Sequence, residues 1–112
     1  MIHDDYLVLC ELHHRWKQLK NDPKTKKDIS NDPTFWQLVD NLNAKEFEAL
    51  KDRAFRSPML RNRSDLRIWA ENKIATKPFQ VRPPEIRWKN NYENKYLWTL
   101  LMNAMEQIER DL

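Results

Sequence analysis

The stretch YENKYLWTLLMNAMEQIERDL, residues 92–112, carries the most regular apolar pattern of the chain. Its large apolar residues recur at alternating spacings of three and four, which places them on one face of an α-helix. That face consists of Trp98, Leu101, Met105, Ile108 and Leu112, flanked by Leu97, Leu100 and Ala104. We interpret it as a face buried inside its own domain, although its heptad-like phasing also suits pairing with a second copy of the chain.

Three earlier segments show helix signals of the same kind. Residues 4–20 repeat the three-and-four apolar spacing and predict the first helix. Asp32 followed by Pro33 predicts an N-cap with proline at the first helical position. Asn43 and Glu46 match a capping box, in which each side chain bonds the other residue's backbone amide. The sequence therefore predicts a short second helix after Asp32 and a third after Asn43.

The segment after the third helix is less regular. Ser57-Pro58 and Ser64-Asp65 both have the form of a helix start, so we expect a further helix to begin somewhere between them. Prolines then recur over about residues 77–90, where each removes a backbone donor and biases its predecessor toward extended geometry. This stretch predicts an extended, proline-rich arm before the last helix.

Length and composition set the fold class. The chain has 112 residues, which suits one domain, and it contains five Trp, four Phe and three Tyr, enough aromatic mass to form a core. Glycine is absent, which excludes glycine-rich phosphate loops and disfavours tight hairpins. We predict a single all-α domain over residues 1–112, with four or five helices and the arm.

The same composition indicates a compartment. No run of about 18 apolar residues is present, and the N-terminal Met1-Ile2-His3-Asp4-Asp5 is acidic where a signal peptide would be basic. A single cysteine cannot form an intrachain disulfide. We therefore expect no membrane segment and a cytoplasmic location.

Metal-binding and catalytic residues are sparse. Cys10, His13 and His14 fall on one predicted helix, and Cys10 and His14 are spaced so that both could reach one ion. A structural zinc site needs about four ligands, and a Cys/His nucleophile pair would need an orienting group and an oxyanion hole that no motif supplies. We expect an ordinary helix with one histidine at the core edge and the other in water. The prediction is no metal, no cofactor and no enzymatic activity.

Charge is distributed unevenly along the chain. Residues 1–50 hold seven Lys/Arg against nine Asp/Glu, residues 51–89 hold eleven against four, and residues 90–112 hold two against four. The middle block favours arginine, whose planar guanidinium bonds phosphate or carboxylate in a bidentate way. Trp88 lies between two basic residues, where its ring could stack on a base or pack on a protein. The predicted binding residues are Arg53, Arg56, Arg61, Arg63, Arg67, Arg82, Arg87, Trp88 and Lys89.

Two function classes are compatible with these residues. The first is a nucleic-acid-binding accessory or regulatory protein that uses the arginine-rich surface. The second is a protein-binding adaptor or inhibitor, of the small kind that phages and mobile elements encode, acting on a larger enzyme or nucleoprotein complex. The alternative is that the basic stretch is only a solvated face and has no binding role.

Overall fold

The computed structural model describes residues 4–76 and 92–111, with side chains over residues 7–76 and 95–111. Over these ranges the chain is helical and contains no strand, which confirms the all-α prediction. The elements are α1 (Asp4–Asn21), a short 3-10 turn η1 (Ile29–Asn31), α2 (Pro33–Asp40), α3 (Ala44–Ala54), α4 (Ser64–Ala75) and α5 (Tyr92–Asp111). The predicted arm, about residues 77–90, lies outside the described residues. None of the described helices is long and apolar enough to cross a lipid bilayer.

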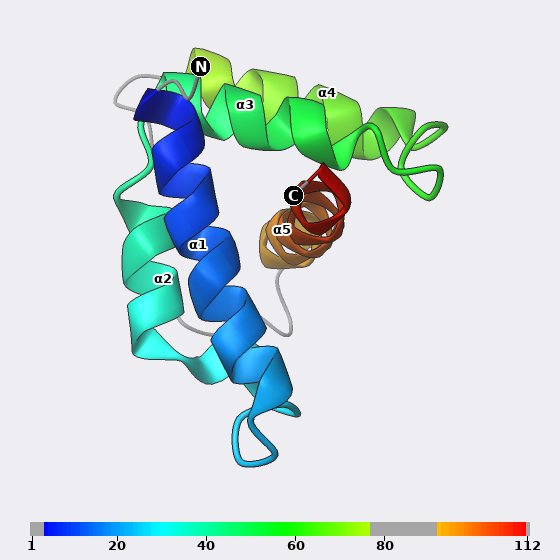
Figure 1. Cartoon of the computed structure of the whole chain (residues 1–112). Coiled ribbons are helices and arrows are strands. Elements are labelled where there is room, and N and C mark those ends of the chain that lie inside the picture. Colours follow the sequence, from blue (N-terminus) through cyan, green and yellow to red (C-terminus); the bar gives the residue numbers. More distant parts are fainter. Residues whose placement is uncertain (1–3, 77–91, 112) are drawn as a thin grey trace.

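The helices form two pairs with α5 between them. Helices α1 and α2 pack side by side, and α3 packs on both α1 and α4. Figure 1 shows α5 end-on in the angle between the α1/α2 pair and the α3/α4 pair. It contacts α3 most extensively and α1 as well. The last helix is therefore the central element on which the others assemble.

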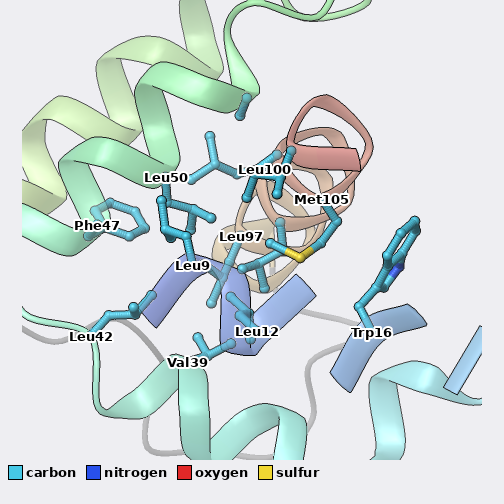
Figure 2. Close-up of a cluster of buried hydrophobic side chains, with 14 of the residues drawn as sticks. Leu9, Leu12, Trp16, Val39, Leu42, Phe47, Leu50, Leu97, Leu100 and Met105 are labelled. Carbon is cyan, nitrogen blue, oxygen red and sulfur yellow. The ribbon is translucent and has the colours of Figure 1, made fainter. Parts of the chain in front are cut away.

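This central position explains why the buried face of α5 is wider than one stripe. Figure 2 shows Leu97, Leu100 and Met105 of α5 facing apolar side chains of other helices, including Leu9, Leu12 and Leu50. The fully buried α5 residues are Leu97, Leu100, Leu101, Ala104, Met105 and Ile108. Trp98 is only half-buried, at the edge of the core. The prediction of internal burial is confirmed for Leu101, Met105 and Ile108, whereas Leu112 lies outside the described residues. The residues predicted to flank the face are buried just as fully, because α1 and α3 cover α5 from two sides.

Two of the predicted helix starts are confirmed by their hydrogen bonds. The Asp32 carboxylate accepts from the Phe35 amide at 2.8 Å, capping α2. Asn43 and Glu46 form the reciprocal capping box of α3, both bonds being 2.8 Å long. A side-chain cap of this kind contributes about 1 kcal/mol to stability, so local sequence fixes where both helices begin.

Asp32 also ties α2 to α1. The Arg15 guanidinium donates to the two Asp32 oxygens at 3.0 and 2.8 Å, and the carboxylate is largely shielded from water. The hydrogen bonds from Arg15 hold the pKa of Asp32 below its ordinary value, and the Phe35 amide adds to this effect. One carboxylate thus serves as a helix cap and as a bidentate clip between two helices.

We expect this clip to make the fold sensitive to acid. Because the folded pKa of Asp32 is depressed, the stabilisation is present above the ordinary aspartate value of 3.8 and is lost as pH falls through the folded pKa. Asp32→Asn keeps a capping side chain but loses the ionic clip, so its unfolding free energy should fall less between about pH 4 and pH 2 than that of the parent. Chemical denaturation at each pH measures this, with the exposed Glu48→Gln as control. An Asp32→Asn profile parallel to the parent's would contradict it.

Candidate functional site

Five of the nine predicted binding residues lie in the described part of the chain. Arg53 is on α3, Arg56, Arg61 and Arg63 are in the α3–α4 connection (residues 55–63), and Arg67 is in the first turn of α4. We refer to these five as the arginine surface. The other four, Arg82, Arg87, Trp88 and Lys89, lie outside the described residues. The connection projects at the end of the α3/α4 pair away from α1 (Figure 1).

The connection is fixed to the body of the domain by two buried residues. Ser57 is 3% exposed and Leu60 is 2% exposed. The Ser57 hydroxyl donates to the Asn103 side-chain oxygen of α5 at 2.8 Å, and Asn103 in turn donates to the Thr99 carbonyl at 2.8 Å. A buried hydrogen bond of this kind is expensive to leave unmade, so it holds the turn against α5.

The further helix expected between Ser57-Pro58 and Ser64-Asp65 is α4, and it begins at the second of these signals, so Ser57-Pro58 does not start a helix. Residues 57–63 form turns, and α4 begins at Ser64 with Arg63 in the N-cap position and no side-chain cap. Backbone bonds from Leu60 to Ser57 and from Arg63 to Leu60, both 3.1 Å, keep the turns tight. Ser57 does not cap a helix because its hydroxyl is directed to α5.

The residues on either side of these anchors, and the Pro58-Met59 pair between them, are exposed. Arg56, Met59, Arg61 and Arg63 all present their side chains to solvent, and Met59 is 77% exposed. Arg67 is exposed one turn into α4. An ordered connection thus displays three arginines and one large apolar side chain, with Arg67 of α4 beside them, without first having to be ordered by a partner.

Asp111 at the end of α5 neutralises one side of the arginine surface. Arg53 donates to the Asp111 carboxylate, and the Arg56 guanidinium lies 3.6 Å from the same oxygen. This interaction links two residues 58 positions apart in the chain. Asp111 is therefore an ion-pair partner of two predicted binding residues.

Asp65 neutralises the other side. The Arg63 guanidinium donates to both Asp65 oxygens at 3.0 and 3.1 Å, and the Tyr96 hydroxyl donates to Asp65 at 3.1 Å. The bonds from Arg63 hold the pKa of Asp65 well below its usual range. Arg63 and Asp65 are both exposed, so their pairing orients Arg63 more than it stabilises the fold.

Arg61 and Arg67 differ from the other three. The Arg67 guanidinium carbon lies 4.4 Å from the centre of the Phe55 ring, a cation–π contact that leaves its hydrogen-bond donors available. No carboxylate in the described part of the chain pairs with Arg61 or Arg67. These two arginines are therefore the best placed to meet an external anion.

The residues considered for a metal site do not converge. His13 is buried beside Trp16, with ring centroids 5.6 Å apart, while His14 is exposed and Cys10 is half-buried. This confirms the expected division into one core-edge histidine and one in water. Burial lowers the pKa of His13, and its Nε2 has no hydrogen-bond partner among the described residues. Among those residues, no group of three or more His, Cys, Asp or Glu could hold an ion.

Met59 and Asp111 are the surface features that sequence reasoning missed. Met59 could have been suspected, because a large apolar residue stands directly after Pro58 between two arginines. Nothing in the sequence signals that Asp111 meets α3. Comparison with known proteins adds no further residue, since no protein-family profile, curated protein or solved structure matches the chain.

Proposed function

We propose that the protein is a small, non-enzymatic nucleic-acid-binding accessory or regulatory protein, and that the arginine surface contacts the phosphate backbone. The observation that carries this proposal is the anchored α3–α4 connection, which displays Arg56, Arg61 and Arg63 with Arg67 beside them. Arginine forms bidentate bonds with phosphate, and several arginines at one end of a domain make an electrostatic footprint for a polyanion.

The ion pairs within the surface are compatible with this role. An exposed ion pair contributes about 0–1 kcal/mol, so a phosphate can displace a carboxylate with little loss of stability. Arg63 is oriented by Asp65, and Arg56 is near Asp111. Both carboxylates can hold the guanidinium groups in place until a phosphate replaces them.

A protein partner is the second candidate. Met59 is 77% exposed and Ile68, one position after Arg67, is 57% exposed. Exposed apolar side chains beside arginines also occur in protein interfaces, where such residues carry much of the binding energy. This observation favours an adaptor or inhibitor, of the phage or mobile-element type, acting on a larger enzyme or nucleoprotein complex.

A salt titration separates the two candidates. If Arg56, Arg61, Arg63 and Arg67 each neutralise one phosphate, the logarithm of the association constant for a labelled duplex should fall with log[salt] at a slope of roughly −3.6. Fluorescence anisotropy with duplex DNA, single-stranded DNA and RNA between about 50 and 200 mM salt measures this slope. Failure to bind any of them at low salt would overturn the nucleic-acid proposal. A nuclease-resistant partner of fixed stoichiometry would then support the protein-binding alternative.

We expect Asp111→Asn to strengthen nucleic-acid binding by a few-fold. The substitution removes the negative charge that competes with phosphate for Arg53 and Arg56. Glu106→Gln is the matched control, because Glu106 is exposed on the same helix and the charge change is identical. Anisotropy at fixed salt compares the two. Equal gains in both variants would mean that only net charge matters and that Asp111 does not shield the surface.

A further inference from the structure

Met59 is the most exposed large apolar residue in the described part of the chain, at 77%. It is not on a loose loop. Ser57 and Leu60 on either side of the Pro58-Met59 pair are buried, and the Met59 amide donates to the Ser57 hydroxyl at 3.3 Å. The turn is thus attached at both ends, and its tip holds an apolar side chain in water.

Basic residues stand on both sides of this tip. Arg56 precedes the Ser57 anchor and Arg61 follows the Leu60 anchor, and both are exposed. The pattern is a projecting apolar side chain flanked by cations on an ordered backbone. Proteins that kink DNA insert Met, Leu, Ile, Phe or Pro between base steps. Arginine and lysine side chains of DNA-binding proteins contact the phosphates.

We propose that Met59 acts as a wedge that inserts between adjacent base pairs of duplex DNA, while Arg56 and Arg61 hold the phosphates on either side. This inference rests on the proposed nucleic-acid-binding function. It identifies the nucleic acid as a DNA duplex that can be deformed. The buried anchors matter because a wedge transmits force to the duplex only if its own backbone does not yield. The Ser57–Asn103 bond connects the turn to α5, the centre of the fold.

Duplex DNA fits the chemistry of this tip better than other nucleic acids. Single strands are bound mainly by stacking bases on aromatic rings, and methionine has no flat ring. Phe55, the aromatic residue of the connection, is half-buried and is covered by the Arg67 guanidinium. Double-stranded RNA is recognised chiefly by shape and through its 2′-hydroxyl groups and phosphates.

A wedge predicts a preference for sequences that unstack easily. Pyrimidine–purine steps such as TA kink readily, whereas A-tracts are stiff, so opening a step takes less free energy in the former. We expect the protein to bind a duplex with central TA steps about tenfold more tightly than an A-tract duplex of equal length and charge. Phosphate contacts alone would not distinguish the two.

The experiment measures the affinity of four proteins for each of these two duplexes. The proteins are the parent, Met59→Ala, Met59→Leu and Ile68→Ala. Met59→Ala should bind both duplexes with nearly equal affinity and an unchanged salt slope, since it removes the wedge and no charge. Met59→Leu should keep most of the preference, and Ile68→Ala, a matched exposed apolar residue, should keep all of it. A 2-aminopurine at the TA step should brighten with the parent and not with Met59→Ala.

The outcomes separate this inference from the function on which it rests. Circular dichroism should be the same for all variants, because Met59 and Ile68 are exposed. If the parent binds both duplexes in a salt-dependent manner without preference, or if Met59→Ala keeps the preference, the wedge is overturned and phosphate binding stands. If the parent binds neither duplex but binds single-stranded DNA or RNA, the wedge is overturned and the proposed function stands. If it binds no nucleic acid at low salt, both fall.

Discussion

Leu101→Ala is expected to lower the free energy of unfolding by about 3 kcal/mol, within the range of roughly 2–5 kcal/mol seen for buried leucines. Leu101 is fully buried on α5, which α1 and α3 cover from two sides. Truncation to alanine loses the favourable free energy of burying the deleted methyl groups. It also leaves a cavity that the surrounding helices cannot easily fill. Urea denaturation followed by circular dichroism measures the change, which should appear as a lower midpoint with an unchanged slope.

Two other substitutions on α5 provide the comparison. Glu106→Ala lies on the exposed face of the same helix and should change stability by less than about 0.5 kcal/mol. Trp98→Ala should also destabilise the fold, because the centroid of the Trp98 ring lies 5.9 Å from those of Phe35 and Trp36. If Leu101→Ala unfolds like the parent but abolishes self-association, the face of α5 is a dimer interface and the burial argument fails.

The parts of the fold that can be predicted from the sequence depend on local chemistry. Asp32 and Asn43 are recognisable as caps because a cap acts on amides two or three residues away, so the signal and its partner are adjacent in the chain. The helical character of α5 follows equally from spacing. What spacing does not reveal is that α5 is covered on two sides, which buries Leu97 and Leu100 as fully as Leu101.

The features that local sequence does not reveal involve partners that are distant in the chain. Ser57-Pro58 has the local form of a helix start, but the hydroxyl of Ser57 bonds Asn103, 46 residues away. Trp36 is buried beside Trp98 of α5, with ring centroids 5.9 Å apart, although the two residues are far apart in the chain. No local pattern encodes such packing, because it exists only after the helices have assembled.

The candidate site divides in the same way. Arg61, Arg63 and Arg67, three of the predicted binding residues, are exposed. The Arg63–Asp65 pair joins residues two apart and could have been anticipated. The shielding of Arg53 and Arg56 by Asp111 could not, since it requires the end of α5 to lie beside α3. Sequence therefore locates the arginine-rich block, but it does not reveal that Arg53 is half-buried or which arginines are already partly neutralised.

A triple variant in which Arg61, Arg63 and Arg67 are each replaced by Gln is expected to lose more nucleic-acid affinity than any other variant proposed above. If each arginine neutralises one phosphate, the salt slope should become less steep by about 2.7, which is about 0.9 for each arginine replaced. Helical content should be retained, because all three side chains are exposed and Arg67 contributes only a cation–π interaction with Phe55. Anisotropy titrations across salt, with circular dichroism of each protein, measure both quantities.

The matched control is the triple replacement of Lys24, Lys26 and Lys27 with Gln. These lysines are in the connection between α1 and η1, and their removal changes the net charge by the same amount. General attraction of a basic protein to a polyanion would weaken equally in both variants, whereas a defined site weakens only when its own arginines are replaced. An equal loss of affinity in the two triple variants would mean that the arginine surface contributes only through the net charge of the protein. If the arginine variant stays folded and binds like the parent, the phosphates must be bound by another surface of the protein.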